Sequence, residues 1–384
     1  MTEYQIKLEE IYDKNINFLI GSGASYGLFP TLAVSMKNGD KCHTIETIAT
    51  LIEQSNSQNK QRLNALLFMH YYETCIKPIT LFSLDMLSVE SQKIVIDNYD
   101  TFLKTILAIL SKRRSSDNKC NLFTTNYDGC LALTADKILK HGKIEFVIND
   151  GSRGFRTRYL QAKNFNSYLR QTGVFSLQHT DIPQINLIHL HGSAYWLKHD
   201  ENIVVDYNKS TNSTLVTDES ALKPFSDLLN VEATSFENLD TYASGFDEKF
   251  DDIAIQFLDQ YNLLPIVNPT KWKFHETVFE EHYYQMLRAM SYEFEKPNTV
   301  FITFGFSFAD EHILNLVKRS LSNPSLQLFV CCFNDDDFNT MQAKFNGHDN
   351  VQFITSESGN LDFGKFNKHA FSLTLQPKAT EDEL

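Results

Sequence analysis

Four apolar segments of the sequence end in the same way, at a glycine or a polar residue. They are NINFLI (15–20), CNLFTT (120–125), INLIHL (185–190) and TVFITF (299–304), which stop before Gly21, Asn126, His191 and Gly305. Shorter runs with the same character occupy 144–148, 326–333 and 351–355. Short continuous apolar runs are typical of strands that are buried on both faces of a sheet. The sequence therefore predicts seven buried strands.

Helical patterns lie between these predicted strands. Apolar residues repeat at helical spacing over 99–110 and again over 279–294. Strands that alternate with helices form a parallel sheet with helices on both faces. We therefore expect an α/β protein built on a doubly wound, Rossmann-like parallel sheet.

Two segments do not fit the alternation, and we interpret them as insertions in one domain over residues 1–375. The segment 42–114 is mostly helical in pattern and is far longer than a crossover between two strands requires. The segment 199–269 is acidic, rich in Asn, Ser, Thr and Asp, and weakly periodic, so we expect an irregular lid, a small subdomain or long loops. The tail 376–384 is expected to be flexible.

Composition narrows the classes of function. A formal net charge of −13 at pH 7 argues against direct, sequence-specific binding of nucleic acid. No apolar run reaches the roughly 18 residues of a membrane span, and the N-terminus has no apolar leader, so we expect a cytoplasmic protein. The six cysteines include no C-x-x-C pair and no Cys/His group with metal-ligand spacing. Reduced thiols and no structural zinc are therefore expected.

A glycine-rich turn, GSGASYG, follows the first predicted strand directly. Small residues at such a turn allow backbone N–H groups to approach a diphosphate, and the N-terminus of a following helix favours its negative charge. The spacing of Gly21, Gly23 and Gly27 differs from G-x-G-x-x-G. The motif alone therefore also fits a tight turn without a ligand.

Polar residues follow the other predicted strands. Asn126 and Asp128 lie in TTNYD, His191 lies in HLHG, and Ser307 lies two residues after a fourth strand. Open parallel sheets bind ligands outside the carboxyl ends of their strands, so these groups point to one shared crevice. Each residue alone also has a structural explanation, Asn126 and Ser307 as turn or helix caps and His191 as a buried structural histidine.

In their order along the chain, GSGAS, TTNYD, LHG and FGFSFADEHI resemble the successive motifs of sirtuin-like NAD-binding domains. The resemblance covers about residues 15–313 and is strongest to a divergent bacterial branch associated with antiviral NAD depletion. It implies that the diphosphate loop consists of Gly21, Ser22, Gly23, Ala24 and Ser25. It further implies that Asn126 and His191 are the catalytic pair and that Asp128 binds the nicotinamide carboxamide. Gly305 and Ser307 would contact the adenosine half of NAD.

The chain departs from the sirtuins that deacetylate proteins. Pro30 is followed by Thr31 and Leu32 rather than by a Pro-Asp-Phe-Arg-like segment, and no cysteine for a zinc ribbon occurs between Cys130 and Cys331. We therefore expect hydrolysis of NAD to nicotinamide and ADP-ribose instead of peptide deacetylation. Such a reaction has a transition state like the oxocarbenium ion of glycoside cleavage. An asparagine can position water or the ribose, and a histidine can accept a proton near neutrality.

Other functions fit parts of the same pattern. A sensor module with this fold would bind NAD or ADP-ribose without turnover. A dehydrogenase is disfavoured by the order of the four motifs and the poor G-x-G-x-x-G fit, and a P-loop NTPase is excluded because no G-x-x-x-x-G-K-[ST] occurs. The resemblance also implies a homo-oligomer and, in some defence pairs, a HerA-type hexameric ATPase as partner.

Overall fold

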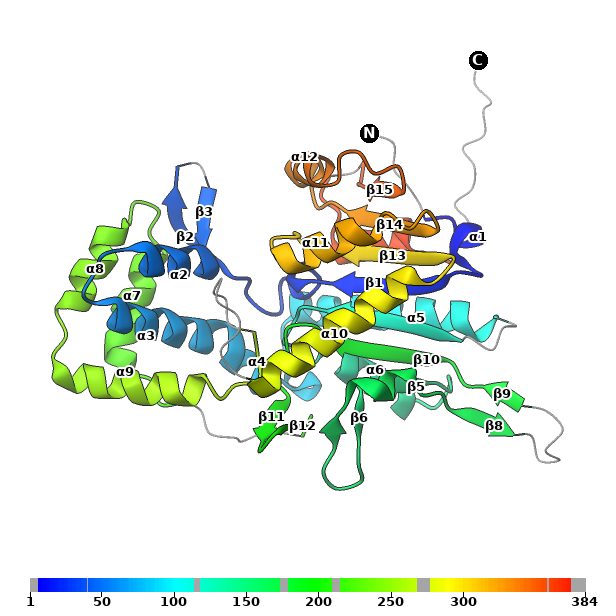
Figure 1. Cartoon of the computed structure of the whole chain (residues 1–384), viewed down its shortest axis with the longest axis horizontal. Coiled ribbons are helices and arrows are strands. Elements are labelled where there is room, and N and C mark those ends of the chain that lie inside the picture. The colour runs from blue at the N-terminus through cyan, green and yellow to red at the C-terminus, as the bar shows by residue number, and fades with distance from the viewer. Residues whose placement is uncertain are drawn as a thin grey trace, which may run out of the picture.

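The computed structural model describes residues 6–39, 41–113, 118–172, 179–208, 215–267, 277–357 and 359–373. The predicted tail 376–384 lies outside these residues. The chain forms a sheet domain and a separate helical lobe, which lies to the left in Figure 1. No helix in the described ranges is both long and apolar enough to cross a lipid bilayer.

A parallel sheet of seven strands forms the centre of the sheet domain, in the order β15-β14-β13-β1-β4-β10-β5. The strands are β1 (Asn15–Ile20), β4 (Lys119–Thr124), β5 (Val147–Asn149), β10 (Gln184–His189), β13 (Thr299–Phe304), β14 (Leu326–Cys331) and β15 (Val351–Ile354). All seven predicted strands are present, with shifts of a few residues at their ends. The chain moves from β1 to β4 on one side and later returns to β13 on the other, so the topology reverses at β1.

Helices cover both faces of this sheet, which confirms the doubly wound arrangement. On one face, α5 (Glu90–Ser111) and α6 (Cys130–Lys140) pack against β1 and β4 together with α13 (Phe363–Lys365) and the π-helical turn Phe366–Ala370. On the other face lie α10 (Thr277–Glu295), α11 (Glu311–Ser320) and α12 (Asp335–Lys344). Among the remaining elements, α1 (Leu8–Ile11) precedes β1.

The segment 42–114 is not one insertion, because its last helix belongs to the sheet domain. The apolar stripe of α5, from Tyr99 to Leu110, is buried in the core beside β1 and β4. A parallel connection between neighbouring strands needs a helix that lies on the sheet, and α5 supplies it. The inserted part therefore ends before α5.

The helical lobe combines two segments that are distant in the sequence. The first segment contributes the hairpin of β2 (Ala33–Asn38) and β3 (Lys41–Thr44), then α2 (Ile45–Gln54), α3 (Lys60–Tyr71), the π-helical turn Tyr72–Ile76 and α4 (Lys77–Thr80). The second contributes α7 (Glu219–Leu229), α8 (Phe236–Ser244) and α9 (Glu248–Tyr261). Their apolar side chains share one core, separate from those on the faces of the sheet.

The described part of 199–269 contains three helices of this lobe, so it matches the small subdomain among the expected alternatives and is not an irregular segment. Each of its helices follows a residue with a capping side chain, namely Asp218, Ser235 and Asp247. The helices are short and mostly solvent-facing; α8 buries only Leu239 and Ala243. Their buried residues nevertheless recur at helical spacing, as Phe250, Ala254, Phe257 and Tyr261 do in α9, and all three helices pack against α3. The expectation of a weakly periodic segment is therefore wrong.

Short strands complete the fold. An antiparallel sheet contains β11 (Trp196–His199), β12 (Asn202–Val205), β7 (Tyr159–Leu160) and β6 (Ser152–Arg153), in that order. A hairpin is formed by β8 (Arg170–Thr172) and β9 (His179–Asp181), and the 3-10 helices are Ser22–Ser25, Leu84–Met86 and Ala162–Asn166.

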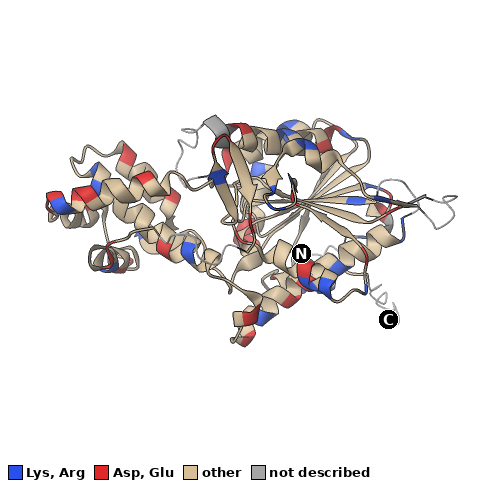
Figure 2. Cartoon of the chain, turned by 90° about the horizontal axis from the view of Figure 1, so that it is seen from below, with Lys and Arg blue, Asp and Glu red and all other residues tan. Residues whose placement is uncertain are grey.

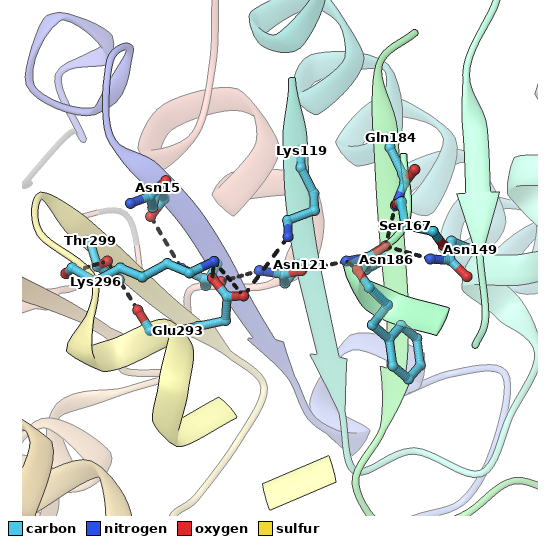
Figure 3. Close-up of polar contacts among 12 residues, drawn as sticks. Asn15, Lys119, Asn121, Asn149, Ser167, Gln184, Asn186, Glu293, Lys296 and Thr299 are labelled. Carbon is cyan, nitrogen blue, oxygen red and sulfur yellow. Dashed lines mark hydrogen bonds and ion pairs between the residues drawn. The ribbon is translucent and has the colours of Figure 1, made fainter. Parts of the chain in front are cut away.

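A chain of asparagines, three of them buried and Asn149 half-buried, fixes the register of four neighbouring strands (Figure 3). The amide of Asn121 donates to Asn17 at 2.7 Å, Asn186 donates to Asn121 at 2.8 Å, and Asn149 donates to Asn186 at 3.0 Å. A slip of one residue would leave these buried amides unpaired, which is costly. The ladder therefore sets how the strand ends that follow it lie relative to one another.

Charged residues lie mainly on the helices and loops, and they leave the strands of the large sheet almost uncharged (Figure 2). Lys119, at the start of β4, is the one charged residue among these seven strands. It is buried and lies 3.9 Å from the carboxylate of Glu293 on α10. The carboxyl ends of the strands carry polar residues instead.

Candidate functional site

Two glycine turns meet where the topology of the sheet reverses. One contains Gly21 and Gly23 after β1, and the other contains Gly305 after β13. Gly21 N donates to the carbonyl of Phe304 and Gly23 N to the carbonyl of Gly305, each at 3.0 Å. A Cβ atom on Gly21 would lie 2.3 Å from the oxygen of Gly305, and one on Gly305 would lie 2.6 Å from the nitrogen of Ala24. Gly305 also has φ +65°, in the left-handed region. Glycine is therefore required here so that the two turns can pack backbone to backbone.

The glycine turn does not lead into a long helix, contrary to the expectation from the sequence. Ser22–Ser25 forms a single 3-10 turn, and the next α-helix, α2, begins only at Ile45 in the lobe. Any recognition of a diphosphate here would therefore depend on the turn itself rather than on a helix dipole.

Asn126 is held at the end of β4 by its neighbours. The hydroxyl of Thr124 donates to the carbonyl of Ile20 at 2.8 Å and accepts the N–H of Asn126 at 3.0 Å. The side-chain amide of Asn126 donates to the carbonyl of Gly21 at 3.1 Å. Its Oδ1 atom is buried and has no hydrogen-bond partner among the described residues. A fixed amide with a free acceptor is thus left beside the glycine turn.

Ser25 connects the glycine turn to Asn126 and Asp128. Its hydroxyl donates to Oδ2 of Asp128 at 2.7 Å and lies 3.4 Å from the amide nitrogen of Asn126. The hydroxyl of Tyr99 lies 2.8 Å from Ser25, and it donates because the single proton of Ser25 is already given to Asp128. Asp128 also accepts the N–H of Cys130 at 3.0 Å. Ser25 and Asp128 therefore connect the glycine turn after β1 to the turn that follows β4.

The two histidines of HLHG have different environments. Nε2 of His191 lies 3.0 Å from Oδ2 of Asp310, and both side chains are largely buried. His189 is buried behind the site, where Nδ1 lies 3.0 Å from the carbonyl oxygen of Asn126. Burial lowers the pKa of His189, which favours its neutral form. Of the two, His191 is the one that lines a cavity.

Asp310 has two functions in the structure. Its Oδ1 atom accepts the N–H groups of His312 and Ile313 at 2.9 and 3.1 Å and so caps α11, while Oδ2 faces His191. The cap of α11 is therefore Asp310 and not Ser307. Asp310 was not among the candidate residues predicted from the sequence, although an Asp before a helical run is a recognisable capping signal.

The segment that follows α9, after the lobe, is bonded to both turns that carry the candidate residues. Val267 N donates to the carbonyl of His191 at 2.8 Å, and the hydroxyl of Tyr127 donates to the carbonyl of Val267 at 2.8 Å. Gly192 pairs with Ile266, and a Cβ atom on Gly192 would lie 2.1 Å from the oxygen of Pro265. The glycine of LHG is thus needed where this segment approaches the sheet.

Two cavities meet at these turns and share Ser22, Thr31, Gly305, Phe306 and Ser307 in their walls. The first cavity, about 740 Å³, lies between the glycine turns and the ends of β13 and β14, and is also lined by Gly23, Ala24 and Asp337. The second cavity, about 440 Å³, contains Ser25, Asn126, Asp128, His191 and Asp310 in its wall. Volumes of this size are usual for sites that bind small molecules or cofactors.

Nine of the ten residues singled out from the sequence therefore line one or both of two adjoining cavities. Gly21 instead supports the site through its contacts with Gly305 and Asn126. An extended ligand with two halves fits this arrangement, one half in each cavity with the glycine turns between them. No group of three or more His, Cys, Asp or Glu side chains arranged to hold a metal occurs in the part of the chain that the structure describes.

A comparison with curated proteins finds no match to the chain. The family model for the SIR2-like domain matches residues 121–354, which is more than half of the chain. The matched segment contains Asn126, Asp128, His191, Gly305 and Ser307, and begins after the first glycine turn. The chain therefore belongs to the family of SIR2-like domains.

Proposed function

We propose that the protein is an NAD glycohydrolase, which cleaves NAD to nicotinamide and ADP-ribose. Membership of the SIR2-like family supports an NAD-dependent function. The observation that carries the more specific proposal is the pairing of Asn126 and His191 in the wall of the second cavity. The buried acceptor of Asn126 and the oriented imidazole of His191 are the groups that a hydrolysis at the ribose carbon requires.

NAD would extend across both cavities. The adenosine half occupies the first cavity, the diphosphate passes the glycine turns, and the nicotinamide ribose enters the second cavity beside Asn126 and His191. Open parallel sheets bind dinucleotides at the point where their topology reverses, and the two glycine turns lie at that point.

In the reaction, the bond between the ribose C1′ and the nicotinamide nitrogen breaks. Its electron pair passes to the pyridinium ring, which leaves as neutral nicotinamide, and the oxygen of a water molecule adds to C1′ with loss of a proton. The Oδ1 atom of Asn126 accepts a hydrogen bond from this water or from a ribose hydroxyl. His191 accepts the proton.

Asp310 determines which nitrogen of His191 accepts that proton. An ionised carboxylate only accepts hydrogen bonds, so Nε2 of His191 carries hydrogen toward Oδ2 of Asp310. The basic nitrogen is then Nδ1. The carboxylate also stabilises the imidazolium that forms, as the aspartate of a hydrolytic triad does.

The test is incubation of the purified protein with NAD, followed by chromatography. We expect nicotinamide and ADP-ribose to appear in equal amounts without any added acceptor. Binding of NAD without release of nicotinamide would overturn the proposal and favour a sensor that binds the dinucleotide. Transfer of ADP-ribose to protein, with no free ADP-ribose, would identify a transferase instead.

We further propose that this activity serves bacterial antiphage defence by depletion of NAD, within a homo-oligomer and with a HerA-type hexameric ATPase as a candidate partner. An uncontrolled enzyme of this kind would harm its own cell, which argues for control by assembly. The proposal predicts that activity depends on assembly or on a co-encoded partner. A monomer at micromolar concentration that is equally active with and without that partner would contradict it.

A further inference from the structure

The helical lobe forms one wall of the second cavity, opposite the ends of the strands. The lobe residues in this wall are Ala33, Thr44, Glu46, Tyr71, Cys75 and Ile79. Glu46 is the only one of these six that carries a carboxylate. The inserted lobe therefore brings a negative charge to the cavity that contains Asn126 and His191.

Glu46 lies in the first turn of α2, where a negative charge is favourable, but it does not cap the helix. The cap of this helix is made by Thr44 and Thr47, whose side chains and backbone N–H groups bond reciprocally at 2.8 and 3.3 Å. The carboxylate of Glu46 is half-buried, and it makes no hydrogen bond or ion pair with any other described residue. No positively charged side chain among the described residues therefore neutralises this carboxylate at the cavity.

The side chain of Tyr127 places this charge close to the site. Burial raises the pKa of the Tyr127 phenol, and the negative charges of Glu46 and Asp310 raise it further. Tyr127 follows Asn126 directly and lines the same cavity. Glu46 from the lobe and Asp310 from the sheet therefore both act on the residue next to Asn126.

We infer that the carboxylate of Glu46 binds the positively charged nicotinamide-ribose half of NAD. The inference rests on the proposed function, because it takes NAD as the ligand of the second cavity. Bound NAD has a pyridinium ring, and during cleavage its positive charge moves onto the ribose. An unpaired carboxylate in a partly enclosed cavity attracts both forms more strongly than it would in water. The lobe is then part of the substrate site.

The test compares two dinucleotides that differ in the charge of the nicotinamide ring. NAD⁺ carries a positive ring, whereas the ring of NADH is neutral. The dissociation constants of both are measured by calorimetry in Asn126→Ala protein, where turnover is expected to be blocked, and in the same protein with Glu46→Gln. Glu53→Gln is the matched control, because Glu53 lies on the same helix and does not line the cavity.

The inference predicts that Glu46→Gln lowers the preference for NAD⁺ over NADH by on the order of 10-fold, while Glu53→Gln leaves it unchanged. Binding of ADP-ribose, which lacks the nicotinamide, should be the same in all variants, and this shows that the fold is intact. An unchanged preference in Glu46→Gln would overturn the inference.

The two proposals fail separately. If the wild-type protein releases nicotinamide but both glutamine variants keep the same preference, the role of Glu46 is wrong and the glycohydrolase stands. If the wild-type protein releases no nicotinamide but the preference falls only in Glu46→Gln, the glycohydrolase is wrong and the charge contact stands.

Discussion

His191 and Asp310 are 119 residues apart in the sequence, and their side chains lie 3.0 Å apart in the structure. His191 follows β10 and Asp310 follows β13, two strands that are separated in the sheet by β1 and β4. The same carboxylate caps α11. The position of the helix and the orientation of the histidine therefore depend on one residue.

Asp310→Asn tests this relationship. Asparagine is as good a helix cap as aspartate, so α11 should remain in place. It cannot stabilise an imidazolium and can donate toward His191, so we expect kcat to fall on the order of 10²-fold or more. Asp218→Asn is the control, since Asp218 caps α7 with the same two kinds of bond and lines neither cavity. Equal kcat in the two variants would show that Asp310 acts only as a cap.

Gly305→Ala tests the contact between the two glycine turns. The new methyl group would meet the backbone of Ala24 at 2.6 Å and would push the turns apart. We expect binding of ADP-ribose to weaken by at least about 10-fold, because the turns would no longer fit the diphosphate. The measurement is calorimetry with ADP-ribose.

Gly142→Ala is the matched control for this substitution. Gly142 has φ +64°, nearly the value at Gly305, but has open space around it. Both variants carry the cost of a left-handed alanine, about 1 kcal/mol, and only Gly305→Ala adds the collision. Equal binding by the two variants would contradict the role of the turn.

Asn121→Ala tests the asparagine ladder. It would leave Oδ1 of Asn17 without its partner and would remove one of the two acceptors of the Asn186 amide, which keeps the carbonyl of Phe165. Each unpaired buried group costs about 1–3 kcal/mol, so the midpoint of urea unfolding should fall clearly. Asn262→Ala, at an exposed position, should change it little. A similar midpoint for both variants would mean that the ladder does not stabilise the sheet.

The lobe should lose stability in acid because of His70. Burial lowers the pKa of this histidine from 6.5 to about 4, and its ring is bonded to Ser226 at 2.8 Å. The unfolded chain then binds more protons than the folded chain between these two pH values, so stability falls as the pH drops below 6.5. The loss from this residue is about 2 kcal/mol at pH 5. His70→Gln should reduce the slope of thermal stability against pH in this window, and an unchanged slope would contradict the assignment.

The sequence predicted the strands and the positions of most candidate residues, because buried parallel strands and their polar ends leave a local signal. β1 and β13 have the predicted bounds, and Asn126, His191 and Ser307 lie where their strand ends suggested. The residues that complete the site left no such signal. The pairing of Asp310 with His191 and the position of Glu46 depend on contacts between distant segments, and the lobe itself joins two segments that no local pattern connects.

The most direct test of the central claim is release of nicotinamide by the wild-type protein, Asn126→Ala and His191→Ala, measured together with binding of ADP-ribose. We predict that the wild-type protein releases nicotinamide and that each substitution reduces the rate by on the order of 10²-fold or more, with little change in binding of ADP-ribose. The double variant should be scarcely slower than either single one, since the two residues act as a unit. Near-normal release by both single variants would contradict the account.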